Sequence, residues 1–184
     1  MRERSGTIGI DMGSTNMMLG YLNAELKFVA CWQFKNTITE LVDNKGVPLH
    51  VRIRRFKKEF ISYLDKWNPR RVLAERFMPR GIRGTLIEVV NIMIGIMAAI
   101  CVRRKINFRV LTASTWKNSL NKRFRTTKND NPLNRLYKAF KIKQRHYIDA
   151  MLIAHYRNDP KFTALQSVNS TIKKLTRPIS KLEA

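Results

Sequence analysis

Three acidic side chains stand in apolar surroundings, where an ionised carboxylate is costly to bury unless it is paired. Asp11 ends the apolar run TIGID, Glu75 ends RVLAE, and Asp149 lies within HYIDAMLIA. Carboxylates that are brought together repel one another, and a hard divalent cation such as Mg²⁺ relieves that repulsion. Two such ions can activate a water and stabilise the leaving oxygen during phosphodiester cleavage. The three acids therefore predict a metal site for phosphodiester chemistry.

A histidine accompanies one of these acids. His146 precedes Asp149 by three residues, which places both side chains on one face of a helix. Its imidazole could bind the metal, or it could position or deprotonate the attacking water. His50 and His155 have no such companion, and we expect them to be structural.

Taken one at a time, the three acids also have structural explanations. An aspartate between a strand and a glycine is a common turn former, and this describes Asp11. Glu75 could pair with a neighbouring arginine, and Asp149 could pair with Arg145 one helical turn away. It is the joint occurrence of all three in a strongly basic chain that favours a metal site.

The composition points to a polyanionic partner. The chain of 184 residues carries 36 Lys and Arg against 13 Asp and Glu, a formal net charge of +23. A surface this basic is typical of nucleic-acid binding, and the 44% hydrophobic content excludes a disordered basic tail protein. Residues 116–145 contain ten Lys or Arg and one acid, Asp130, which predicts a surface that follows phosphates.

The elements that must position these residues alternate between strands and helices. This order predicts an α/β layered domain with a mixed sheet. If the strands that end in Asp11 and Glu75 pair in parallel, the two carboxylates lie side by side at one sheet edge. We expect loops at 36–50 and 121–131, and a short helix that Ser114 or Thr115 caps and that runs through Leu120. The remaining elements are strands at 7–11, 16–22, 27–34, 71–75 and 107–112, and helices at 51–67, 84–103 and 144–158.

One domain and a tail account for the whole chain. Residues 1–158 form the predicted domain, and 159–184 form a basic tail that we expect to be partly disordered. The apolar run 86–102 is short for a membrane span and contains Glu88 and Asn91, so it predicts a buried helix. With no secretory signal and two cysteines in apolar surroundings, Cys31 and Cys101, a cytoplasmic protein with free thiols is expected.

The segments IGIDMGS, VLAERFM and HYIDAMLIA resemble the active-site segments of RuvC-type Holliday junction resolvases, of the ribonuclease H-like superfamily. Their order and wide separation span residues 8–154. The resemblance implies a five-stranded mixed sheet flanked by helices and a homodimer that binds four-way DNA junctions. It implies paired symmetric nicks that leave 5′-phosphate and 3′-hydroxyl ends, and two Mg²⁺ or Mn²⁺ ions per site. The implied metal-binding and catalytic set is Asp11, Glu75, His146 and Asp149.

Further roles follow from the same resemblance. Lys117 would reach the scissile phosphate, and the apolar helix 84–103 would pack on the sheet and on a partner subunit. Phe77 is a candidate base-stacking wedge, although core packing is its expected role. The first motif has Met12 where bacterial resolvases more often have proline, which indicates a divergent phage or bacterial member. The implied DNA contacts are Arg76, Arg80, Arg83, Lys117, Lys122, Arg123, Arg125 and Lys128.

Three other functions remain open. The stretch TIGIDMGSTN also resembles the first phosphate loop of actin-like, sugar kinase and chaperone ATPases, but the sequence holds no second Asp-x-Gly turn and is short for their two domains. A non-catalytic DNA-binding protein would use the acids structurally. A nuclease of the same fold could instead act on other branched DNA or on RNA–DNA hybrids, because substrate shape is read by the surface.

Overall fold

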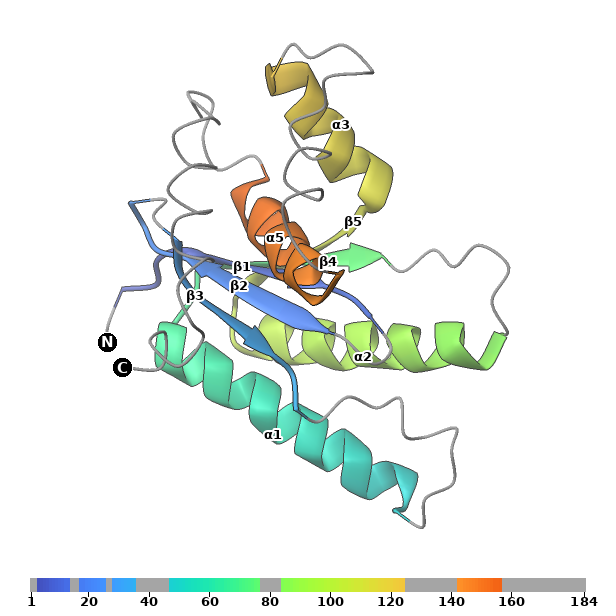
Figure 1. The fold of residues 1–184 in the computed structure, drawn as a ribbon. Helices are drawn as coiled ribbons and strands as arrows, with labels where there is room; N and C mark the ends of the chain where they lie inside the picture. Colours follow the sequence, from blue (N-terminus) through green and yellow to red (C-terminus); the bar gives the residue numbers. More distant parts are fainter. Residues whose placement is uncertain are drawn as a thin grey trace.

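The computed structural model describes residues 3–13, 17–25, 28–35, 47–76, 84–124 and 142–156 of the chain. It confirms an α/β domain with a mixed five-stranded sheet in the order β3-β2-β1-β4-β5, flanked by helices (Figure 1). In chain order the elements are β1 (Thr7–Asp11), β2 (Met18–Leu22), β3 (Phe28–Gln33), α1 (Leu49–Trp67), β4 (Arg71–Arg76), α2 (Gly84–Arg103), β5 (Asn107–Thr112), α3 (Ala113–Phe124) and α5 (Ile142–His155).

The sheet combines an antiparallel meander with parallel pairs. Strands β1, β2 and β3 pair antiparallel, whereas β1, β4 and β5 run parallel to one another. The parallel register sets Ile10 opposite Ala74, so the next residues, Asp11 and Glu75, lie at the same edge of the sheet. The expected parallel pairing of these two strands is confirmed.

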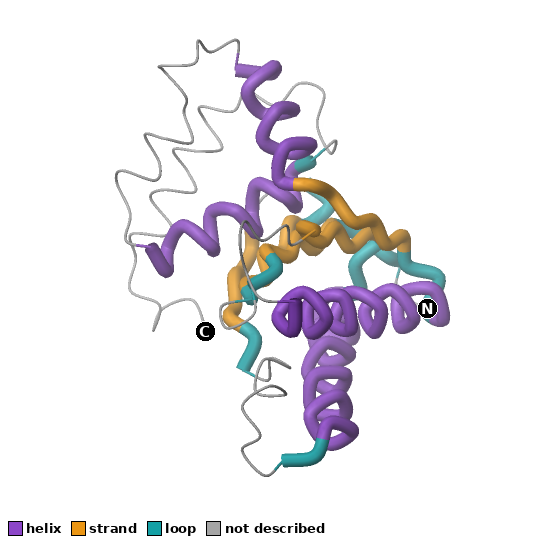
Figure 2. The backbone as a smooth tube through the Cα atoms, turned by 90° about the vertical axis from the view of Figure 1, so that its right-hand side faces the viewer, coloured by secondary structure: helices purple, strands orange, loops and turns teal. Residues whose placement is uncertain are grey.

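The two faces of β1 meet different helices. Ile8 and Ile10 are fully buried in a core that also contains residues of α1 and α2, and Figure 2 shows these two helices crossing below the sheet. The alternate residues, Gly9 and Asp11, face α5, because successive side chains of a strand point to opposite faces. A Cβ at Gly9 would overlap the carbonyl oxygen of Ala150, so glycine allows α5 to lie directly on β1.

Helix α1 shows how the sequence pattern sets a boundary. Its buried residues, Arg52, Phe56, Phe60 and Leu64, recur every four positions on the face turned to the core. The helix ends where Asn68 adopts the left-handed conformation, with φ of 42°, and its backbone N–H bonds to the carbonyl of Leu64. The predicted end of this helix at residue 67 is confirmed.

Several predicted boundaries were wrong. Helix α1 begins at Leu49, inside the expected loop 36–50, and α5 spans Ile142–His155 instead of 144–158. The start of α3 at Ala113 follows Thr112, whose hydroxyl accepts a hydrogen bond of 3.2 Å from the N–H of Thr115. Thr112 therefore provides the cap that was assigned to Ser114 or Thr115. The helix continues to Phe124, so the first residues of the expected loop 121–131 are helical.

The two cysteines are free, as expected. Cys101 is fully buried and Cys31 is half-buried. Among the described residues, no helix has the length and apolar character needed to cross a membrane. The predicted tail 159–184 and the remainder of the loops at 36–46 and 125–131 lie outside the described residues.

Candidate active site

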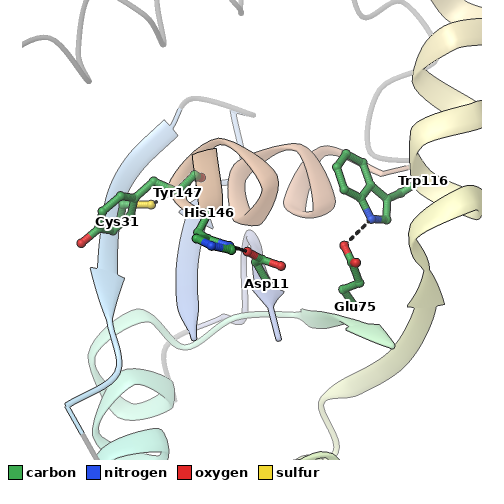
Figure 3. A network of polar contacts seen from close by, with 6 residues as sticks. All are labelled: Asp11, Cys31, Glu75, Trp116, His146 and Tyr147. Atoms are coloured by element: carbon green, nitrogen blue, oxygen red, sulfur yellow. Dashed lines mark hydrogen bonds and ion pairs between the residues drawn. The ribbon is translucent and has the colours of Figure 1, made fainter. Parts of the chain in front are cut away.

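Asp11 is hydrogen-bonded to a histidine that lies far from it in the sequence. Its side chain ends β1 on the face that meets α5, and the residue is only 6% exposed. The Nδ1 of His146 donates a hydrogen bond of 2.6 Å to Oδ2 of Asp11 (Figure 3). This bond and the negative charge of Asp11 raise the pKa of His146, against the lowering effect of burial. The sequence placed His146 beside Asp149, and in the structure its hydrogen bond is made to Asp11.

Glu75 is held by a tryptophan. It is half-buried at the end of β4, and its Oε2 accepts a hydrogen bond of 2.7 Å from Nε1 of Trp116 (Figure 3). Burial is the main cause that raises the pKa of Glu75, and the negative charge of Asp11 raises it further. The bond from Trp116 and the charges of Lys117 and His146 lower it. Asp11 therefore lies close enough to Glu75 to disfavour the ionised form of Glu75.

Asp149 belongs to the same charged group. It is half-buried on α5, one helical turn after His146. Its charge, together with that of Glu75, contributes to the raised pKa of His146. All four residues that the sequence singled out are therefore electrostatically coupled at one edge of the sheet, next to the first turns of α5.

The free carboxylate oxygens of the site are of the chemical type that a divalent cation binds. Asp11 and Glu75 each bond one carboxylate oxygen to a fixed donor, and within the described chain the other oxygen makes no hydrogen bond. Carboxylate oxygens are the ligands that Mg²⁺ prefers, and the mutual repulsion of these two acids is what a cation relieves. As the side chains stand, no three His, Cys, Asp or Glu residues of the described ranges form a group that could hold a metal ion.

Helix α3 places a lysine side chain, that of Lys117, next to the site. Lys117 follows Trp116, and its Nζ lies 4.9 Å from the centroid of the Trp116 ring. Because β5 pairs in parallel with β4, the helix that follows β5 begins beside Glu75. Lys117 therefore lies near Glu75, and its charge lowers the pKa of that carboxylate.

Part of the expected DNA-binding set can be placed. Arg76 is exposed at the last position of β4, directly after Glu75. Lys122 and Arg123 belong to α3, but their side chains are outside the described set. The remaining expected positions, Phe77, Arg80, Arg83, Arg125 and Lys128, lie outside the described residues.

Trp116 had no assigned role in the sequence. Its signal was weak: a tryptophan shortly after a strand, in a segment noted only for its basic charge. A buried indole N–H usually requires an acceptor, but the sequence did not reveal that β5 lies beside β4. The register of Glu75 with Leu111 is what brings this donor to the carboxylate.

Comparisons with known proteins agree on the architecture. No family model and no curated protein matches the sequence. The structure is similar to RuvC of Thermus thermophilus in complex with a Holliday junction substrate, with a TM-score of 0.59 and 19% identity over 82% of this chain and 90% of that one. A second structure of Thermus thermophilus RuvC is similar with a TM-score of 0.56 and 17% identity, over 81% of this chain and 90% of that one. The yeast mitochondrial Holliday junction resolvase Ydc2 is similar with a TM-score of 0.56 and 15% identity, over 84% of this chain and 78% of that one. The chain thus has the ribonuclease H-like fold that these resolvases share.

Proposed function

We propose that the protein is a metal-dependent endonuclease that resolves four-way DNA junctions by paired, symmetric nicks, in recombination or repair. The observation that carries this proposal is the coupling of Asp11, Glu75, His146 and Asp149 at one sheet edge. The similarity to a RuvC structure solved with a Holliday junction and the net charge of +23 support branched DNA as the substrate.

The same four residues would hold two Mg²⁺ or Mn²⁺ ions. Bound there, the ions would activate the attacking water and stabilise the leaving oxygen of the phosphodiester. The protein's own contribution is to fix the ligands. His146 orients Asp11, and the N–H of Trp116 orients Glu75, so each carboxylate presents its remaining oxygen to the site.

Basic residues next to the carboxylates would hold the DNA backbone. Arg76 and Lys117 flank Glu75 on two neighbouring elements. We assign Lys117 to the scissile phosphate because its charge acts directly on Glu75. Arg80, Arg83 and the basic residues of 116–145 would contact phosphates further along the arms, which gives affinity without sequence preference.

An exposed apolar face on α2 supports a homodimer. Ile92 is 38% exposed and Val102 is 72% exposed, and the exposed residues between them include Gly95 and Ala99. Apart from its own helix backbone and chain neighbours, a Cβ at Gly95 would meet no atom of the described residues within 4 Å. We propose that this face packs against the same face of a second copy, as a self-complementary two-fold interface requires. Two copies supply the two active sites that paired nicks need.

Cleavage of labelled DNA tests the proposal. Four-way, three-way, hybrid and linear duplex substrates are incubated with the protein, with and without Mg²⁺. Paired nicks confined to the four-way junction are expected, because the site is duplicated by the dimer. Equal cutting of every branched form would reduce the protein to a general structure-specific nuclease. No metal-dependent cutting of any substrate would refute the catalytic role.

The variant Asp149→Asn separates a nuclease from a passive binder. The amide keeps the size of the side chain and removes the charge that a cation needs. We expect the variant to bind the junction as well as the wild type in a gel-shift assay and to lose cutting. A variant that cuts at the wild-type rate would show that Asp149 is structural.

A further inference from the structure

Trp116 combines complete burial with a polar contact to the proposed site. Its side chain is 0% exposed and is the largest fully buried one among the described residues. The edge of its indole donates to Glu75, and the face of the same ring carries the ammonium group of Lys117 at 4.9 Å. One side chain therefore contacts both a proposed metal ligand and a proposed phosphate-binding cation.

The fold gives this tryptophan little freedom. Leu111 pairs with Glu75 across β4 and β5, and α3 begins two residues later. The hydroxyl of Thr112 lies 2.9 Å from that of Ser114 and 2.7 Å from that of Thr115, and it caps the backbone N–H of Thr115. These bonds fix the first turn of α3, and they therefore fix the position of the Trp116 ring relative to Glu75.

The chemistry of the indole suits a carboxylate that must also bind a cation. The indole Nε1–H only donates, and it carries no formal charge. It can therefore orient Glu75 without neutralising it, whereas an arginine or lysine at the same place would repel an incoming Mg²⁺. The ring face attracts Lys117 by a cation–π interaction. In the described part of the chain, no ion pair joins Lys117 directly to Glu75.

We propose that Trp116 is a positioning residue that holds Glu75 and Lys117 in fixed places on either side of the reacting phosphate. This inference rests on the proposed function. It adds a residue that makes no contact with metal or DNA itself: the ring edge leaves Oε1 of Glu75 open, and the ring face keeps Lys117 from collapsing onto the carboxylate.

Replacing one atom of the ring tests the inference. Benzothienylalanine, introduced at position 116 by nonsense suppression, keeps the shape of tryptophan but has sulfur in place of the N–H. We expect kcat for junction cutting to fall about 10- to 100-fold, the usual effect of losing a partner of a metal ligand. The KM for the junction should stay unchanged, and half-maximal activity should need more Mg²⁺.

Trp67 offers a matched control in the same protein. Its indole nitrogen is buried and has no hydrogen-bond partner among the residues that the structure describes. The same replacement at position 67 removes an N–H and adds a sulfur without affecting the site, so kcat and the Mg²⁺ requirement should not change. Equal losses at 116 and 67 would overturn the positioning role and indicate a general effect on the fold.

An NMR measurement gives a readout that does not depend on cutting. The chain has three tryptophans, so the ¹⁵N-labelled protein should give three indole N–H signals. We expect Glu75→Gln and the addition of Mg²⁺ each to shift the signal of Trp116 and to leave that of Trp67 in place. If neither Glu75→Gln nor Mg²⁺ changes the chemical shift of the Trp116 indole N–H, the inference is refuted.

The two hypotheses fail in different ways. A wild-type protein that cuts no DNA with Mg²⁺ refutes the proposed nuclease. A wild-type protein that cuts junctions, together with a benzothienylalanine variant at 116 that cuts equally well at every Mg²⁺ concentration, refutes the role of Trp116 alone.

Discussion

Each of the two strand-end carboxylates is bonded to a donor from a different helix. Asp11 accepts from His146 on α5, and Glu75 accepts from Trp116 on α3. The negative charge of Asp11 raises the pKa of Glu75, and each hydrogen bond fixes the carboxylate that accepts it. At the scale of single residues, the site is therefore a pair of oriented carboxylates and not only a region of negative charge.

Removing the histidine should weaken the site without destroying it. His146→Ala removes one of the four proposed metal-holding side chains and leaves the Asp11 carboxylate free to rotate, so we expect kcat to fall at least about 10- to 100-fold. Asp11→Asn, which changes the ligand itself, should abolish cutting. His50→Ala is the control, because His50 is exposed on α1 and should leave the rate unchanged. A rate for His146→Ala equal to the wild type would contradict the positioning of Asp11.

The thiols should be protected in the native protein. Burial raises the pKa of Cys101 to about 12 and raises that of Cys31 as well. A thiol with such a pKa is thiolate in roughly one molecule in ten thousand at pH 8, and the thiolate is the reactive form. We expect Ellman's reagent to label the fully buried Cys101 slowly in buffer, and to label both cysteines rapidly in denaturant. Fast labelling of Cys101 in buffer would mean that its packing opens readily.

At the scale of elements, the site depends on how closely α5 lies on the sheet. Gly9 and Gly20 both face this helix: the backbone of α5 overlaps the space of a side chain at Gly9 and would lie in tight contact with one at Gly20. His146 and Asp149 are on the same helix, so a shift of α5 moves them relative to Asp11. The close packing at these glycines therefore sets where His146 and Asp149 lie relative to Asp11.

Gly9→Ala should test this dependence. The added methyl overlaps the carbonyl of Ala150, which is backbone and cannot turn away. Overpacking of this kind costs about 1–3 kcal/mol, and we expect a lower melting temperature and slower cutting. Gly20→Ala is the milder comparison, because its Cβ would lie 3.1 Å from the nitrogen of Met151. Equal stability of the two variants would contradict the tight packing at Gly9.

The sequence predicted the elements better than their contacts. Asp11 and Glu75 were expected side by side because both end apolar strands, and the parallel pairing of β1 and β4 confirms this. The partner of Glu75 was missed because it depends on the register of β5, which hydrophobic periodicity does not encode. The cap of α3 was misplaced by two residues or more, since Thr112, Ser114 and Thr115 are all good capping residues.

At the scale of the whole molecule, charge should determine affinity for DNA. The net charge of +23 implies that binding releases many counterions, so affinity should fall steeply with salt. Arg76→Ala should weaken junction binding and reduce the slope of log K against log salt by about 1. The measurement is fluorescence anisotropy across a salt series. Ser62→Ala, an exposed neutral site on α1, is the control, and an unchanged slope for Arg76→Ala would exclude a phosphate contact.

The exposed face of α2 should control both assembly and the pairing of nicks. Val102 is 72% exposed, so Val102→Glu should leave the fold of one copy intact while placing two charges against each other across a two-fold interface. We expect analytical ultracentrifugation to show a dimer for the wild type and a monomer for the variant, with unchanged circular dichroism. On a cruciform plasmid, the variant should give single nicks where the wild type gives paired ones. Lys57→Glu is the control: it places an acidic residue at an exposed position of α1, and this variant should remain dimeric. A variant at Val102 that stays dimeric and still nicks in pairs would exclude α2 as the interface.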